Sequence, residues 1–193
     1  MIRFRLFLLI LLFLTPLNGF GGLPEPHPLA GKGIVILPAS SSSAELVLYE
    51  LPGIRLIGNI RQKELPALAP FVKVKSNETA LAVMSVREGW LRIIQDFAGR
   101  EAWVELRDDW NYRSWERYLA GRTIRLVPGL KEHMYRFRSS PTDKGEQSGA
   151  ATPGFPLRAL AVHDDWAEVA TAGQTLGWLR WRDGDGRMLV TVE

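Results

Sequence analysis

The side chains of this sequence that could take part in catalysis, metal binding or ligand binding are its tryptophans, its tyrosines and a few histidines and aspartates. Catalysis needs an activated group held by partner residues. We find no cysteine, no Gly-x-Ser-x-Gly sequence and no His-Glu-x-x-His sequence. The histidines fall in an expected spacer and in two expected turns, at His27, His133 and His163. The sequence therefore predicts no enzyme, no catalytic residue and no cofactor. A hydrolase with an unrecognised convergent site is a minor alternative.

Two acidic segments contain the residue types of metal sites. His163-Asp164-Asp165 directly precedes a tryptophan, at the position expected for a turn between two strands. Asp183-Gly-Asp185-Gly is similar to the start of a calcium-binding loop but lacks the later carboxylates of such a loop. We interpret both segments as turns and predict no metal site.

Four tryptophans recur in two similar segments. In each copy an apolar run is followed by a short polar turn, a tryptophan, a loop and a second tryptophan. Trp90 and Trp103 are thirteen residues apart, and Trp166 and Trp178 are twelve residues apart. Such spacing indicates an internal duplication.

Strand alternation places the repeated tryptophans on the less apolar face of each copy. Successive side chains of a strand point to opposite faces, so Trp90 shares a face with Arg92, and Trp178 with Arg180. Partly exposed aromatic rings are frequent at binding hot spots. We therefore predict ligand-binding grooves lined by Tyr49, Trp90, Trp103, Tyr135, Trp166 and Trp178. Alternatively, loops cover these rings and make them a peripheral part of the core.

The remainder of the chain consists of short apolar runs separated by turns, which favours an all-β sandwich or barrel. One segment differs. Asp108 and Asp109 precede residues 110–120, where Tyr112, Trp115 and Leu119 have helical spacing, and Gly121 follows. We predict a helix that connects two β units.

The repeated unit resembles the bacterial SH3 (SH3b) domain family, whose usual ending is Gly-Trp-x-x-Val, a turn and Gly-Trp-Val. The matching residues are Gly89-Trp90-Leu-Arg-Ile93 with Ala102-Trp103-Val104, and Asp165-Trp166-Ala-Glu-Val169 with Gly177-Trp178-Leu179. The segment Tyr135-Arg-Phe-Arg-Ser-Ser-Pro141 is similar to the family's opening strand and turn, whereas Leu48-Tyr-Glu-Leu-Pro52 of the first copy is only loosely similar. The resemblance covers most of residues 44–193. It implies two small SH3-like barrels that bind peptidoglycan, its peptide stems or an envelope protein.

The N-terminus has the features of an export signal. Arg3 and Arg5 precede an unbroken apolar run over residues 6–14, and small residues follow. Nine apolar residues are too few to cross a bilayer, which takes about 20. We expect a cleaved signal peptide rather than a retained anchor, and hence a periplasmic or secreted protein without stable membrane insertion. The predicted organisation is a signal peptide (1–21), a flexible spacer (22–43), SH3-like domain 1 (44–108), a helical connector (109–122) and SH3-like domain 2 (123–193).

The charge balance argues against nucleic acid as a partner. The chain has 24 lysines and arginines against 21 acidic residues, and loss of Arg3 and Arg5 with the signal leaves it close to neutral. Without a basic run there is little to neutralise phosphates. The predicted function is non-catalytic recognition of peptidoglycan or an envelope protein. The alternative is a structural or assembly factor that acts only through protein–protein contacts.

Overall fold

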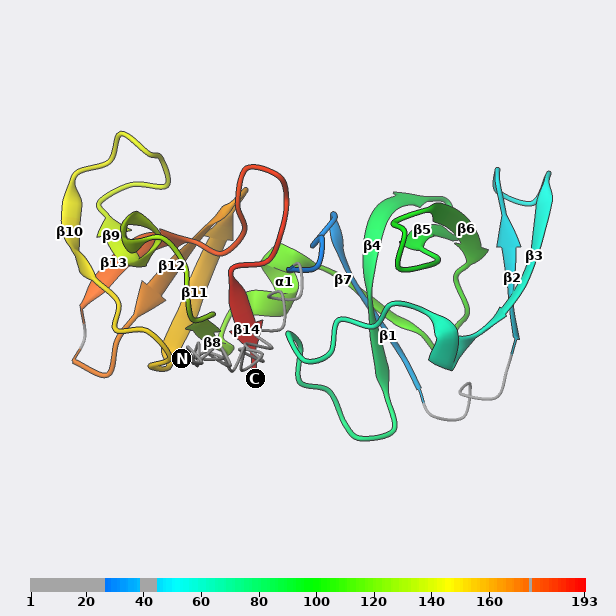
Figure 1. Ribbon diagram of the computed structural model, residues 1–193, viewed down its shortest axis with the longest axis horizontal. Helices are drawn as coiled ribbons and strands as arrows, with labels where there is room; N and C mark the ends of the chain where they lie inside the picture. The colour runs from blue at the N-terminus through cyan, green and yellow to red at the C-terminus, as the bar shows by residue number, and fades with distance from the viewer. Residues whose placement is uncertain (1–26, 39–44, 174) are drawn as a thin grey trace, which may run out of the picture.

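The chain folds mainly into β-strands. The computed structural model describes residues 27–38, 45–173 and 175–193. Within these residues it contains two antiparallel sheets of seven strands each, which occupy the two halves of an elongated molecule (Figure 1). The predicted all-β fold is confirmed at this level.

The first sheet is formed by residues 33–114. Its strands are β1 (Gly33–Leu37), β2 (Glu45–Tyr49), β3 (Leu56–Arg61), β4 (Thr79–Arg87), β5 (Trp90–Ile94), β6 (Glu101–Glu105) and β7 (Asn111–Ser114). They lie in the order β3-β2-β6-β5-β4-β1-β7. The edge strands of this sheet are therefore β3 and β7.

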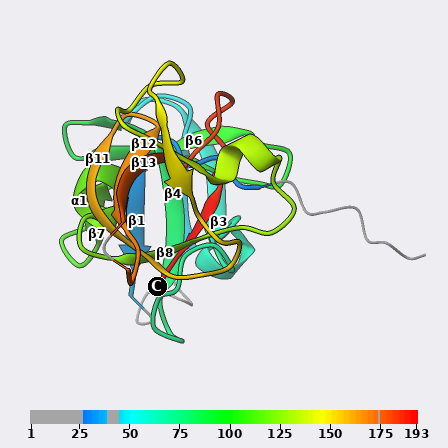
Figure 2. The ribbon, with the colours of Figure 1, turned by 90° about the vertical axis from the view of Figure 1, so that its left-hand side faces the viewer.

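The second sheet repeats the arrangement of the first. Its strands are β8 (Thr123–Leu126), β9 (Arg136–Arg138), β10 (Gln147–Ala150), β11 (Leu157–His163), β12 (Trp166–Ala170), β13 (Leu176–Arg180) and β14 (Val190–Val192). Their order, β10-β9-β13-β12-β11-β8-β14, is that of the first sheet with seven added to every strand number. Figure 2 looks along the molecule with β11, β12 and β13 side by side. Two sheets with the same connectivity are the expected product of a duplication.

The helices within the described ranges are short. They are the 3-10 turns η2 (Gln62–Glu64) and η3 (Glu132–Tyr135) and the α-helix α1 (Trp115–Leu119). The helix predicted for residues 110–120 thus extends over only its second half. β7 occupies residues 111–114, where it pairs with β1. The three residues whose spacing predicts one helix face therefore lie in two different elements: Tyr112 is in the strand β7, and Trp115 and Leu119 are buried residues of α1.

β1 lies within the expected flexible spacer 22–43, where the apolar run from Ile34 to Leu37 could form a strand. The structure has this strand, but as an internal strand of the first sheet rather than as part of a spacer. β1 pairs with β4 on one side and β7 on the other. Its side chains are buried on both faces, with Ile34 and Val35 inaccessible to solvent. A strand covered on both faces has a continuous apolar sequence without alternation, and Gly-Ile-Val-Ile-Leu is too short for that pattern to distinguish it from an apolar spacer segment.

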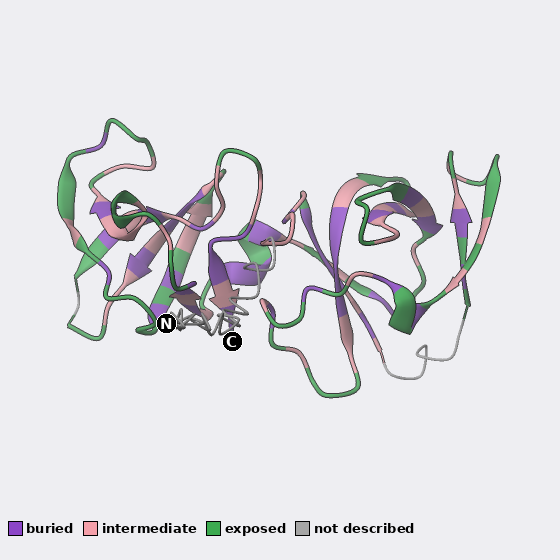
Figure 3. Cartoon of the chain, in the orientation of Figure 1, coloured by how far each residue is buried: buried purple, intermediate pink, exposed green. Residues whose placement is uncertain are grey.

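Two apolar clusters form the core, and one of them joins the two halves of the chain. The smaller cluster lies inside the first half, between β1, β2, β4, β5 and β6. The larger cluster contains side chains of the second sheet and of α1. It also contains Ile34 of β1 and Ala82 of β4, which lie on the side of the first sheet that faces away from the smaller cluster. Figure 3 shows buried residues concentrated in α1 and β14, between the two halves. The back of the first sheet therefore packs against the second half.

Hydrogen bonds reinforce this junction. The buried indole N–H of Trp115 donates to the Ala30 carbonyl at 2.7 Å, and its ring lies 5.3 Å from that of Trp181. Arg182 donates to the Gly31 carbonyl at 2.8 Å, and the Val192 amide donates to the Phe71 carbonyl at 2.8 Å. These contacts couple both halves into one body.

The predicted signal peptide, residues 1–21, lies outside the described residues, as do parts of the predicted spacer. Among the residues that the structure does describe, no helix is long and apolar enough to span a membrane.

Candidate functional site

The repeated tryptophans lie on the sheet faces that point away from the cores. In β5, Leu91 and Ile93 are fully buried, whereas Trp90 and Arg92 between them are half-buried. We call the surface formed by this side of β2, β5 and β6 the first tryptophan face; it carries Tyr49, Trp90, Arg92, Glu101, Trp103 and Glu105. The second tryptophan face, on β9, β12 and β13, carries Arg138, Trp166, Glu168, Trp178 and Arg180.

Strand register makes the two faces equivalent position by position. Trp103 is paired with Arg92 on one side and with Tyr49 on the other. Trp178 is paired in the same way with Glu168 and Arg138. Trp90 is opposite Glu105, and its counterpart Trp166 is opposite Arg180. The tryptophans are therefore retained in both copies while the charged residues around them change.

Tight turns place the first tryptophan of each face. In the β4–β5 turn, Glu88 and Gly89 both have positive φ values, of 20° and 78°. In the β11–β12 turn, Asp164 has a φ of 51°, a conformation that aspartate tolerates better than most residues. Trp90 and Trp166 start the strands that follow. The polar residues before each tryptophan thus have a conformational role.

On the first face, aromatic rings and an ion pair pack together. The rings of Tyr49 and Trp90 meet edge to face, with centroids 5.2 Å apart. The Arg92 guanidinium lies 5.7 Å from the Trp103 ring centroid, and its Nε is 3.0 Å from the Glu101 carboxylate. Edge-to-face and cation–π contacts orient such rings while leaving part of them accessible.

A cavity of about 80 Å³ lies beside the first face, lined by Leu46, Val47, Tyr49, Val104, Glu105, Arg107 and Trp110. Trp110 is 7% exposed, and its indole N–H has no hydrogen-bond partner among the described residues. The Arg107 guanidinium lies 5.6 Å from the Trp110 ring centroid. Sequence reasoning placed Trp110 in the connector and missed it here, because it lies outside the repeated segments.

On the second face, Trp166 is more deeply buried than its counterpart, at 7% exposed. The Arg180 guanidinium covers it, 4.7 Å from the ring centroid. Arg180 also binds the Asp143 carboxylate, with an N–O distance of 2.6 Å, and lies 3.5 Å from Asp165. The hydrogen bond from Arg180 holds the pKa of Asp143 below its usual range, and the same bond raises the pKa of Arg180.

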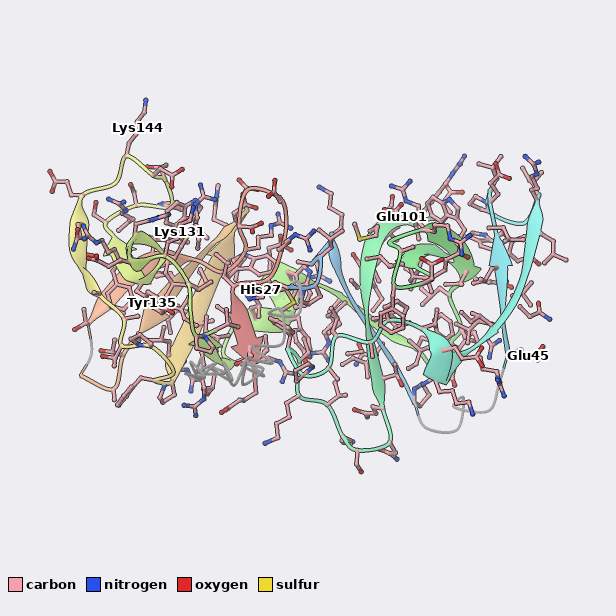
Figure 4. The ribbon with its side chains drawn as sticks, in the orientation of Figure 1. His27, Glu45, Glu101, Lys131, Tyr135 and Lys144 are labelled. Carbon is pink, nitrogen blue, oxygen red and sulfur yellow. The ribbon has the colours of Figure 1, made fainter. Side chains whose placement is uncertain are left out.

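Tyr135, which we predicted to lie in a groove, has a different position. It ends η3, and its hydroxyl donates to the Val127 carbonyl at 3.0 Å and accepts from the Leu130 amide at 3.2 Å. Figure 4 shows it on the second half of the molecule. The register position that matches Tyr49 belongs to Arg138. The structure thus brings Tyr49, Trp90 and Trp103 together, and Trp166 and Trp178 together, without Tyr135.

The other candidate groups have structural partners. His163 lies 3.3 Å from Asp164, with both side chains exposed. The Asp183 carboxylate accepts hydrogen bonds from the Asp185 and Arg187 amides, which confirms the predicted hairpin turn. Across the described ranges, no group of three or more histidine, cysteine, aspartate or glutamate residues is placed to hold a metal ion.

Two larger cavities, of about 500 Å³ each, lie away from both tryptophan faces. One is bounded by the loop over residues 66–71, the turn over residues 96–99 and the segment His27 to Leu29. The other is bounded by residues 69–78 and the end of β14. No tryptophan lines either cavity, so the tryptophan faces and these cavities are separate features.

No protein-family model matches the chain, and no curated protein matches it.

Proposed function

We propose that the chain is an exported, non-catalytic binding protein in which two tandem SH3-like barrels recognise cell-wall peptidoglycan or an envelope protein. The ligand would lie on the two tryptophan faces. The observation that carries this proposal is the presence of paired tryptophans at matching positions of two sheets, on the side opposite each core.

The contrast with the other tryptophans supports this assignment. Trp115 and Trp181 are fully buried in the larger core cluster, where their rings pack against each other. Trp90, Trp103 and Trp178 are half-buried on sheet surfaces. A core does not need an indole at a solvent-facing position, whereas a binding surface gains a large apolar contact and a hydrogen-bond donor from it.

The junction between the halves adds a second argument. Because both sheets share a core cluster, the two tryptophan faces are held at a fixed separation. Two weak sites on one rigid body bind a repetitive target such as a cell-wall polymer with increased avidity, provided that the target presents both ligands at the right spacing.

Co-sedimentation with purified sacculi tests the proposal. We expect the protein to pellet with sacculi, and the double variant Trp103→Ala, Trp178→Ala to bind about 10- to 100-fold more weakly, as expected for loss of hot-spot residues. Phe155→Ala removes an exposed aromatic side chain that lies before β11, on none of the strands of either face, and serves as the matched control. A folded double variant that pellets as well as the wild type would contradict the proposal.

The alternative function, a structural or assembly factor, is favoured by one separate observation. The β2–β3 hairpin exposes a concentration of large apolar side chains: Val47, Leu51, Ile54, Leu56 and Ile57. β3 is also an edge strand, and free edges can pair with a strand of another protein. Its counterpart β10 has the sequence Gln-Ser-Gly-Ala, so the fold itself does not require apolar residues there. Co-purification with one envelope protein without binding to sacculi would favour this alternative.

A further inference from the structure

The two tryptophan faces differ in charge at equivalent positions. Where the first face has Glu105 opposite its first tryptophan, the second has Arg180. Where the first face has Tyr49 beside its second tryptophan, the second has Arg138. Two positions next to the tryptophans therefore become cationic in the second copy, whereas a third changes the other way, from Arg92 beside Trp103 to Glu168 beside Trp178.

Cationic side chains also gather at a small cavity on the second face. The cavity is lined by His133, Met134, Arg136, Arg138, Asp143, Trp166 and Arg180, which are three arginines against a single carboxylate. Two of the arginines are paired: Arg136 with Glu132, and Arg180 with Asp143. Their positive charges are thereby largely compensated.

Arg138 is the arginine of this cavity that forms no ion pair of its own with any residue that the structure describes. The cavity's carboxylate, Asp143, is paired with Arg180, although Arg138 also contributes to lowering the pKa of Asp143. The Arg138 guanidinium donates to the Gly145 carbonyl at 3.1 Å. A guanidinium has five N–H donors in a planar fork, and the described residues accept from only part of it. Arg138 is half-buried beside Trp178, where reduced solvation strengthens its attraction for an anion.

The first face has the opposite character. Its arginine, Arg92, is already paired with Glu101. Glu105 is exposed beside Trp90 and forms no hydrogen bond or ion pair with a described residue. An anionic group placed beside Trp90 would therefore meet an unpaired carboxylate. The second face also has a carboxylate, Glu168, but it lies on the side of Trp178 away from Arg138. The one carboxylate that lines the cavity beside Arg138 is paired with Arg180.

We propose that the second tryptophan face binds the carboxylate of a peptide ligand at the small cavity that Arg138 and Trp166 line, with Arg138 as its principal partner and Trp178 on the strand next to Arg138. Arginine pairs with carboxylates through two parallel hydrogen bonds. The cavity volume of about 20 Å³ suits one small group of a ligand rather than a whole ligand. This inference rests on the proposed function, because it assigns a ligand chemistry to one of the two proposed binding faces.

The test compares two probes that differ only in their C-terminal group, acetyl-Ala-Ala with a carboxylate and acetyl-Ala-Ala-amide with a neutral amide. Each is titrated into the purified protein while the indole N–H and arginine Nε–H resonances are followed by NMR. We expect the carboxylate probe to shift the Trp178 and Arg138 signals, and the amide to bind at least about tenfold more weakly. Arg138→Gln should weaken carboxylate binding by about 10- to 100-fold, as expected for loss of a charge-assisted hydrogen bond, and Arg138→Lys should restore part of it. Arg117→Gln, which removes an exposed arginine of α1 outside both tryptophan faces, is the matched control.

The outcomes separate this inference from the proposed function. Equal binding of both probes at the second face overturns the charge assignment and leaves the face as a binding surface. Binding of the carboxylate probe only at the first face overturns the assignment as well. Displacement of the probe by inorganic phosphate at concentrations well below those of the probe reassigns the site to phosphate. If neither probe binds but the protein still pellets with sacculi, only the inference fails; if sacculus binding is absent too, both the inference and the assignment of peptidoglycan as the ligand fail.

Discussion

Gly177 occupies a position that should not accept even one methyl group. It lies buried in β13, directly before Trp178, and a Cβ built on it would be 2.6 Å from the Cβ of Phe137 and 3.2 Å from the hydroxyl of Ser148. Ordinary contacts of this kind begin at 3.4 Å. Because a Cβ atom moves only with its backbone, Gly177→Ala requires β9 and β13 to separate by several tenths of an ångström.

The expected cost of Gly177→Ala follows from this geometry. Overpacking that shifts the backbone typically costs about 1–3 kcal/mol of unfolding free energy. For a chain of this size, each kcal/mol lowers the melting temperature by about 2–4 °C. We therefore expect a decrease of about 2–12 °C, measured by thermal unfolding with circular dichroism, together with a changed Trp178 environment in fluorescence.

Gly184→Ala is the matched control for Gly177→Ala. Gly184 lies exposed in the hairpin turn before β14, where an added methyl group would have no atom within 4 Å, and its φ is not left-handed. The substitution should change stability by less than about 0.5 kcal/mol. If both variants melt at the wild-type temperature, the close approach of β9 and β13 is not the reason for glycine in the Gly-Trp pair.

Three further predictions concern the second face, the junction and the exposed hairpin. Because the pKa of Asp143 is lower in the folded protein than in the unfolded chain, its ionised carboxylate stabilises the fold at pH values above the ordinary aspartate pKa of about 3.9. This stabilisation is lost as the pH falls through the lower pKa of the folded state, so chemical unfolding at several acidic pH values should show a smaller acid-induced loss of unfolding free energy in Asp143→Asn than in the wild type. Trp115→Phe removes the buried hydrogen bond to Ala30 and part of the shared core, so it should cost about 2–4 kcal/mol and shift the unfolding of both halves together; separate transitions by fluorescence and circular dichroism would contradict this coupling. Ile54 is 80% exposed, so Ile54→Asp should leave the melting temperature within about 2 °C of the wild type while reducing capture of any envelope protein that docks on the β2–β3 hairpin.

The features that could be predicted from sequence are those encoded locally. Alternation in β5 and β6 is strict, with Leu91 and Ile93 buried and Trp90 and Arg92 between them, so the sequence pattern alone separated the two faces. The matched spacing of the tryptophans likewise indicated two similar units, and the structure has two sheets with the same strand order. Short-range pattern was sufficient here because neighbouring strands are joined by tight turns.

The features that escaped prediction depend on contacts distant in sequence. The apolar run from Ile34 to Leu37 is compatible with a strand, but no local pattern reveals that β4 and β7 flank it and that both of its faces are covered. Tyr135 resembled Tyr49 in sequence position, but its hydroxyl is used by the turn over Val127 and Leu130. Arg138 takes the equivalent place through pairing with Trp178, a relation that appears only once the register of β9 and β13 is known.

The most direct test of the central proposal follows the seven tryptophans individually. In a two-dimensional NMR spectrum of the protein labelled with nitrogen-15, each indole N–H gives one signal. On addition of solubilised peptidoglycan fragments, we expect the signals of Trp90, Trp103 and Trp178 to shift in a saturable manner, while those of the buried Trp115 and Trp181 stay in place. Saturable binding that moves none of the three surface signals would contradict the assignment of the tryptophan faces as the recognition surface.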